Sequence, residues 1–199
     1  MQEDKDKIDS PKTEQTDNAQ AEGMNKKRVM NEIVSFGKEF VVALVVSIII
    51  TQFVFTIPLV PSGSMLPTIG INERILVEKL TKWYRAPQRG DIVVFPYPDD
   101  PSELYVKRVI GLPGERVEIY SGSVWINGVA LEEPYLIEAT YGVWDIYDVP
   151  EDSVFVMGDN RQSSNDSRRW KTTNYVKIKD IQGRGIAVLW PFQAIRFMK

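Results

Sequence analysis

The chain has 199 residues, a formal net charge of −3 and hydrophobic residues at 43% of its positions, which suits one core of ordinary size. It contains no histidine and no cysteine, so Ser-His-Asp triads, Cys-His sites and thiol metal sites are excluded, and we expect no metal or other cofactor. The charge beyond the acidic first 23 residues is close to zero, which argues against a nucleic-acid partner.

The first 25 residues are almost entirely polar or charged, and acidic residues outnumber lysines among them. Such a segment buries too little apolar surface to offset the entropy lost on ordering. We predict a disordered acidic tail over residues 1–25.

An uncharged apolar run of eighteen residues extends from Phe40 to Ile57. About 20 apolar residues in a helix span the hydrocarbon core of a bilayer. Four basic residues precede the run within residues 26–38, whereas the first charge after it is Glu73. The positive-inside tendency therefore predicts a basic flank and single membrane anchor over 26–60, with a cytoplasmic amino terminus and residues 61–199 outside the cytoplasm.

Two alternatives for the apolar run fit less well. A cleaved secretory signal has a shorter apolar stretch and small residues at its cleavage site, but here Pro58-Leu59-Val60-Pro61 follows. A core helix of a soluble domain is apolar on one side, but Val and Ile occur on every side of this run. We therefore expect an uncleaved anchor.

Residues beyond the anchor form short β-branched and aromatic runs bounded by Gly, Pro, Asn or Asp, which predicts a mainly β, antiparallel domain. Asn127-Gly128 is the dipeptide favoured in a two-residue type I′ hairpin, and residues 132–150 are expected to form a small excursion from the main sheet. The predicted strands cover residues 74–79, 91–95, 105–110, 116–120, 123–126, 129–131, 154–157 and 185–190.

Ser64 lies in the sequence PSGSMLPT, a few residues after the apolar run. A serine hydroxyl needs a neighbouring base to act as a nucleophile near neutral pH, and without histidine that base is a lysine or a carboxylate. A lysine serves only if burial among apolar groups lowers its pKa.

Lys107 is the best candidate for such a base, because it lies within the strand-like run LYVKRVI. Strand alternation places Tyr105, Lys107 and Val109 on one face and Arg108 on the other. An outward-pointing lysine on an edge strand remains the alternative. The polar stretch GDNRQSSNDSRR at 158–169 is equally open, either as a solvated turn or as a set of side chains that orient a base.

The segments around Ser64 and Lys107, the stretch GDNRQSSNDSR and Arg89-Gly90-Asp91-Ile92-Val93 closely resemble, in order, the conserved boxes of type I signal peptidases. This family comprises membrane-anchored Ser/Lys endopeptidases. The resemblance implies a mainly β, antiparallel signal-peptidase-like domain with one amino-terminal transmembrane helix. It also implies that the chain removes signal peptides from exported preproteins.

The resemblance implies a role for each matching residue. Ser64 would be the nucleophile and Lys107 its general base, with the Ser62 hydroxyl and the Ser64 N–H forming an oxyanion hole. Ser164 would orient Lys107. Ion pairs and hydrogen bonds of three residues would hold the framework: Asp159, Asp166 and Arg168. Gln162-Ser163 replaces the Asp-Asn common in the family, which affects only the surrounding contacts.

By the same resemblance, the partners are signal-peptide-bearing preproteins, bound as an extended strand with small residues one and three positions before the cut. A location in the lipid bilayer and near the secretion translocon follows. We also expect apolar residues near the site to rest in the lipid interface: Met65, Leu66, Ile69 and Trp83.

Two other functions are considered. A self-cleaving Ser/Lys repressor would carry a DNA-binding module and no anchor, and a pilin-type processing enzyme would share the catalytic logic. A catalytically degenerate anchored homologue that binds exported chains would have lost Ser64 or Lys107, but both are present.

Overall fold

The computed structural model describes residues 12–140 and 145–198. The chain divides into two compact units, Met1–Ile49 and Ile50–Lys199. The second unit begins earlier than the boundary expected at residue 61. This is because two short strands that follow the apolar run, β1 (Phe55–Thr56) and β2 (Leu59–Val60), both pair with β3 (Glu73–Glu78).

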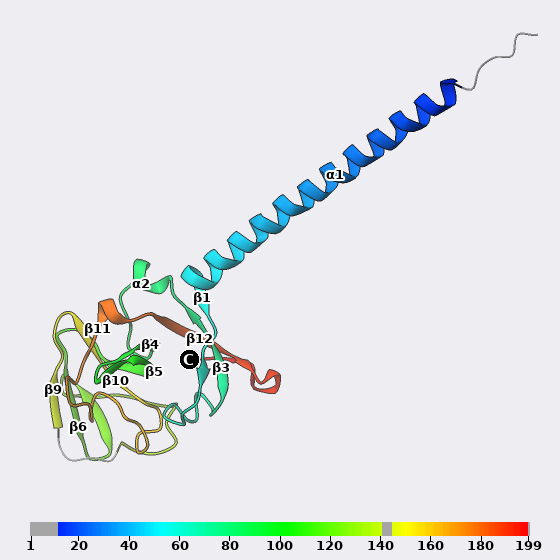
Figure 1. The fold of residues 1–199 in the computed structure, drawn as a ribbon. Helices are drawn as coiled ribbons and strands as arrows, with labels where there is room; N and C mark the ends of the chain where they lie inside the picture. The colour runs from blue at the N-terminus through cyan, green and yellow to red at the C-terminus, as the bar shows by residue number, and fades with distance from the viewer. Residues whose placement is uncertain (1–11, 141–144, 199) are drawn as a thin grey trace, which may run out of the picture. The chain divides into compact units, whose positions relative to one another are not determined.

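The first unit is helical. Helix α1 spans Lys12–Ile49, and one π-helical turn follows over Ile50–Val54 (Figure 1). The segment Met30–Val54 has 25 residues, a mean hydropathy of 2.3 and no residue buried within the protein. A helix of that length and composition is sufficient to cross a bilayer, so the expected apolar helix is present.

The helix begins earlier than the sequence analysis predicts. Residues 12–25 belong to α1, although a disordered tail was expected over 1–25; residues 1–11 of that tail lie outside the described part. Ala, Glu and Gln each occur twice in this stretch and are strong helix formers. Adding residues to an existing helix also avoids the cost of nucleation, so the apolar helix extends into the polar segment.

The second unit contains a large antiparallel sheet in the order β1-β3-β12-β4-β5-β10-β11, in which β2 also pairs with β3 and β13 with β12. Strands β3 and β12 run side by side in Figure 1. The remaining strands of this sheet are β4 (Ile92–Tyr97), β5 (Asp100–Gly111), β10 (Ser153–Met157), β11 (Val176–Lys177), β12 (Gly183–Trp190) and β13 (Arg196–Phe197).

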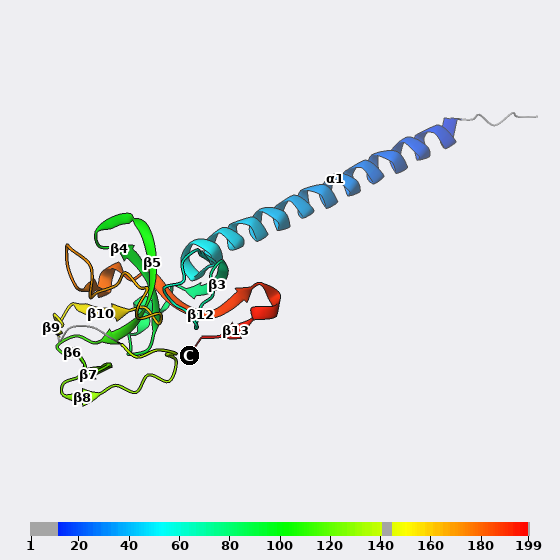
Figure 2. The same cartoon turned by 90° about the horizontal axis from the view of Figure 1, so that it is seen from below.

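A second antiparallel sheet has the order β8-β7-β6-β9. Its strands are β6 (Arg116–Tyr120), β7 (Ser123–Ile126), β8 (Val129–Ala130) and β9 (Asp145–Asp148); β6, β7 and β8 lie together in Figure 2. The predicted hairpin is confirmed, because Asn127 and Gly128 have φ of 50° and 80° and β7 pairs with β8 across them. Within the expected excursion at 132–150, β9 pairs with β6, so this segment contributes an edge strand to the second sheet; residues 141–144 lie outside the described part.

Short helices complete the second unit: α2 (Thr81–Tyr84) and two 3-10 turns at Ile178–Asp180 and Phe192–Ala194. Apolar side chains from β3, β4 and β12 form one core cluster. Met65 and Ile69 are fully buried in that cluster, so the expectation that they rest in the lipid interface is wrong. Their burial instead ties the segment that carries Ser64 to the sheet. Trp83 is 63% exposed and stays a candidate for the interface.

Candidate active site

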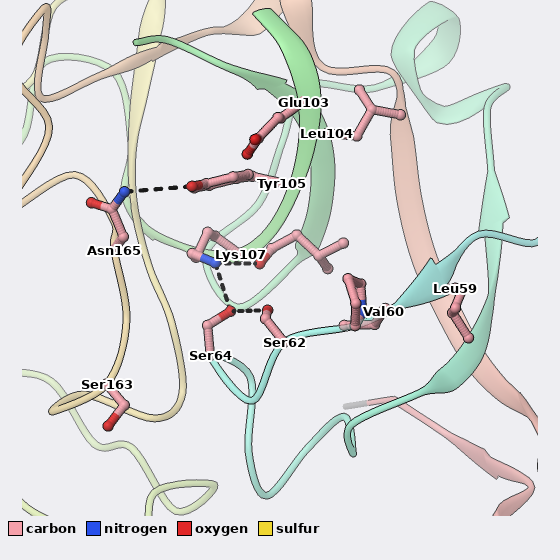
Figure 3. Close-up of a pocket in the computed structure, with 12 residues that line it drawn as sticks. Leu59, Val60, Ser62, Ser64, Glu103, Leu104, Tyr105, Lys107, Ser163 and Asn165 are labelled. Carbon is pink, nitrogen blue, oxygen red and sulfur yellow. Dashed lines mark hydrogen bonds between the residues drawn. The ribbon is translucent and has the colours of Figure 1, made fainter. Parts of the chain in front are cut away.

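Ser64 and Lys107 lie in contact although 43 residues separate them. Ser64 follows β2 and Lys107 is on β5, where it pairs with Val93 of β4. Lys107 Nζ and Ser64 Oγ are 2.7 Å apart in a buried hydrogen bond (Figure 3). In this pair a neutral amine accepts the serine proton, whereas an ammonium donates to the hydroxyl.

The Lys107 side chain is shielded from water, because the residue is only 3% exposed. Its amine donates to the Val106 carbonyl at 3.0 Å and lies 5.0 Å from the centre of the Tyr105 ring. Burial lowers the pKa of Lys107 from 10.5 to about 8, against the opposing effect of the Asp166 and Asp159 charges. Because this pKa lies close to physiological pH, part of the Lys107 population carries a neutral amine there.

Ser62 Oγ lies 3.3 Å from Ser64 Oγ, so a second hydroxyl adjoins the candidate nucleophile. Both serines open onto a cavity of about 320 Å³, and Figure 3 shows their side chains pointing toward each other. One wall of the cavity is the segment from Leu59 to Ser64 and the opposite wall is Glu103 to Lys107, with Ser163 and Asn165 closing one side.

Asp159 is held by a buried ion pair. Arg108 donates to both carboxylate oxygens, at 2.9 and 2.7 Å, and Thr68 donates to one of them. Arg108 and Asp159 are at most 1% exposed at their side chains. Two parallel charge-assisted hydrogen bonds fix the geometry of such a pair, so the segment after β10 is locked onto β5.

Asp166 is held in the same way by a residue of its own loop. Arg168 donates to its two oxygens at 2.8 Å each, and the Gly158 N–H donates at 3.0 Å. Burial alone would raise the pKa of Asp166, but these hydrogen bonds and the Arg168 charge lower it. The predicted framework residues Asp159, Asp166 and Arg168 are therefore brought together beside the Ser64–Lys107 pair.

Ser164 is the predicted site residue whose expected contact is missing. The residue is fully buried, yet within residues 12–140 and 145–198 no group completes a hydrogen bond with its Oγ. The hydroxyl lies near enough to Asp166 to act on the pKa of that carboxyl, and the Lys107 amine points to Ser64 and Val106 instead. Its role in orienting Lys107 stays a prediction.

Two arginines that were not predicted from the sequence organise the site. Arg108 was assigned only to the face opposite Lys107, and Arg161 was not singled out. Arg161 pairs with Glu133, with one hydrogen bond of 2.8 Å, and its Nε donates to the Gly158 carbonyl at 3.1 Å. The available signal for Arg161 was the stretch 158–169, where three arginines stand among Asp, Asn and Ser. Arg108, between Lys107 and Val109, carries no such local signal.

Gly158 is required by close packing at this site. A Cβ at this position would lie 2.4 Å from the Ser64 carbonyl oxygen and 2.2 Å from Ser164 Oγ. We predict that Gly158→Ala lowers the free energy of unfolding by about 1–3 kcal/mol, the usual cost of overpacking. Chemical denaturation in detergent, monitored by tryptophan fluorescence, measures it. Gly37→Ala is the control, because a Cβ there meets nothing within 4 Å; equal stability of G158A and G37A would contradict the prediction.

The low pKa of Lys107 also has a cost in stability. Below pH 8 the amine is protonated in both the folded and the unfolded chain, so the free-energy cost of burying the ammonium is present in full. Between pH 8 and 10.5 the folded chain loses this proton before the unfolded chain does, and the cost disappears. We predict that Lys107→Met stabilises the chain at pH 7 by about 3 kcal/mol, at 1.36 kcal/mol per pKa unit. That advantage should shrink to about 1 kcal/mol at pH 10 in the same denaturation assay. A stability difference independent of pH would show that the amine titrates normally.

Comparisons with known proteins show which family the chain belongs to. The family model "Signal peptidase, peptidase S26" matches residues 33–190. "Signal peptidase I" of Leptolyngbya laminosa is 42% identical over 194 residues, covering 92% of this chain and 91% of that protein, and "Signal peptidase I P" of Bacillus subtilis subsp. natto is 37% identical, covering 88% and 100%. A crystal structure of a signal peptidase I from Enterococcus faecalis matches 50% of this chain and 97% of its own at 37% identity, with a TM-score of 0.45. The chain therefore belongs to the S26 family of signal peptidases.

Proposed function

We propose that this chain is a serine endopeptidase that removes signal peptides from exported preproteins with Ser64 as nucleophile and Lys107 as general base. The observation that carries the proposal is the 2.7 Å approach of a buried amine to the Ser64 hydroxyl, together with a lysine pKa of about 8. Membership of the signal peptidase family supports the same reaction.

The reaction follows from these two groups. Neutral Lys107 removes the Ser64 proton while Oγ attacks the carbonyl carbon before the scissile bond. The lysine ammonium then protonates the leaving amine as the peptide bond breaks, which leaves an acyl-serine. A water molecule, deprotonated by the same amine, hydrolyses the acyl-serine and restores the pair.

The negative charge on the carbonyl oxygen needs donors in the transition state. The Ser62 hydroxyl adjoins Ser64, and the Ser64 backbone N–H belongs to the attacking residue itself. Two such donors, fixed before reaction, form an oxyanion hole without reorganisation cost. We assign this role to Ser62 and Ser64.

The edge of β5 suits an extended substrate. Strand β10 pairs with β5 only from Arg108 to Gly111, so in the described part of the chain the segment Glu103–Lys107 has no strand partner on that edge. The same segment lines the cavity opposite Leu59–Ser64. A preprotein segment added here would gain main-chain hydrogen bonds on the way to Ser64, and the apolar lining near Val60 and Val106 favours small apolar side chains before the cut.

The helix over Met30–Val54 supports anchorage in the membrane. We assign it a single pass with residues 1–25 in the cytoplasm, residues 61–199 outside and the active site near the translocon and the bilayer surface. Because basic residues precede the span, the amino terminus stays inside.

A tag at residue 1 should therefore resist protease added to intact spheroplasts and become sensitive after lysis. Cleavage of the tag before lysis would reverse the orientation.

Loss of either member of the pair should abolish the reaction. We expect Ser64→Ala and Lys107→Ala each to lower the rate of preprotein cleavage by at least about 1,000-fold, because each removes the nucleophile or its only base. The rate is measured on gels, as cleavage of a purified model preprotein by the full chain in detergent. Far-UV circular dichroism checks that each variant is folded.

Lys177→Ala is the control for that experiment, since Lys177 forms an exposed ion pair with Asp152 and lines no part of the cavity. Its rate should match that of the unchanged chain. Normal cleavage by S64A or K107A would show that other groups catalyse the reaction. No cleavage by the unchanged chain would favour a homologue that binds exported chains without this chemistry.

A further inference from the structure

Asn160 holds the backbone on both sides of the Gly63–Ser64 peptide bond. Its backbone N–H donates to the Ser64 carbonyl at 3.0 Å. Its side-chain Nδ2 donates to the Gly63 carbonyl at 3.1 Å. Asn160 thus contacts two successive carbonyl groups of the segment that carries the nucleophile.

The orientation of the Asn160 amide is set by a second contact. Its Oδ1 accepts a hydrogen bond from the Ser163 N–H at 3.3 Å. An amide oxygen only accepts and an amide nitrogen only donates, so the contact with Ser163 directs Nδ2 toward Gly63. Ser163 therefore helps to aim the side chain.

The contact with Gly63 has a direct consequence for the oxyanion hole. The Gly63 carbonyl and the Ser64 N–H belong to one planar trans peptide group, in which the two bonds point in opposite directions. The Leu66 N–H donates to the same carbonyl at 3.2 Å, and the Asn160 amide adds the contact from the opposite segment, so the two donors together fix the direction of the Ser64 N–H. The hydrogen bond from Asn160 also polarises the peptide group and makes that N–H a stronger donor.

Asn160 is itself held between two buried ion pairs. Its neighbour Asp159 is bonded to Arg108, and its neighbour Arg161 is bonded to Glu133. All four of these side chains are at most 7% exposed. The backbone of residue 160 is therefore fixed against both β5 and the segment after β8, which gives a side chain with only two rotatable bonds a defined reach.

We propose that Asn160 is a positioning residue that aims the Ser64 N–H at the oxyanion. The inference rests on the proposed Ser64–Lys107 chemistry and adds a role that neither the ion pairs nor the lysine fulfil. Asn160 does not line the cavity onto which Ser64 opens. It acts on the transition state through one peptide group.

Asn160→Asp tests the proposal, because aspartate has the same shape but no Nδ2 donor. We expect kcat to fall about 10- to 100-fold with KM unchanged, somewhat less than the loss of a direct oxyanion donor. Asn160→Ala, which introduces no charge, should lower kcat in the same range. Asn174→Asp is the matched control, since Asn174 also donates its Nδ2 to a backbone carbonyl, that of Ser167, away from the nucleophile.

A second readout separates positioning from general structure. The probe is a peptide aldehyde ending in alanine: Ser64 Oγ bonds to the aldehyde carbon, the carbonyl π electrons move to oxygen, and the serine proton passes to Lys107. The resulting oxygen occupies the hole. The corresponding peptide alcohol binds the same groove without forming this bond. In N160D and N160A the inhibition constant of the aldehyde should rise about 10- to 100-fold, while that of the alcohol stays unchanged.

The outcomes are distinguishable. If the unchanged chain binds the aldehyde no more tightly than the alcohol, the Ser64–Lys107 chemistry itself is wrong. If that chain prefers the aldehyde and both Asn160 variants keep the full preference, the positioning role is overturned. Equal weakening of the aldehyde and the alcohol would also overturn it, because Asn160 would then only shape the groove.

Discussion

The structure depends on one constraint, which is that an amine buried 2.7 Å from a hydroxyl must be able to lose its proton close to neutral pH. In water the ammonium form of lysine is favoured by several kcal/mol at neutral pH. The fold reduces this preference by placing Lys107 on β5, where it is 3% exposed and packed beside Tyr105 and Val106, which lowers its pKa to about 8. The chain thereby obtains a general base without histidine.

The acidic residues near the site would undo this arrangement if their charges were free. Asp159 and Asp166 both favour the ammonium form of Lys107, but each faces an arginine of its own, Arg108 and Arg168. The two ion pairs therefore hold the polar loop rigid while limiting the field at the amine. Buried pairs of this kind contribute more to geometry than to net stability. Their value here is that they place Gly158 and Asn160 against the backbone of Ser64.

Most of the strands, the hairpin and the reacting pair were predictable from the sequence, because these features depend on local sequence pattern. β-Branched runs with turn residues between them predicted most strands, and Asn127-Gly128 predicted the hairpin between β7 and β8. The absence of histidine, with a serine after the apolar run and a lysine in an apolar strand, indicated the reacting pair. What brought the two together is the pairing of β2 with β3 and of β4 with β5, which periodicity alone does not reveal.

The parts that sequence reasoning missed depend on contacts between distant residues. Arg108 and Asp159 are 51 residues apart, and strand alternation says only which face Arg108 occupies, not what it meets there. From the sequence, Met65 and Ile69 could contact either lipid or a protein core. They are buried in the core because their loop packs on β3 and β12. The helical tail over residues 12–25 mixes helix formers with Thr, Asp, Asn and Gly, so its conformation depends on the long helix that it extends.

The most direct test of the account is a titration of the Lys107 amine in the folded chain. The full chain in detergent would be labelled with lysine carrying ¹³C at Cε, and the Lys107 signal assigned by its absence from K107M. The account predicts a midpoint near pH 8 for that signal, against about 10.4 for exposed lysines. A midpoint close to that of the other lysines would show that the amine is charged at working pH, and Lys107 would then not be the base.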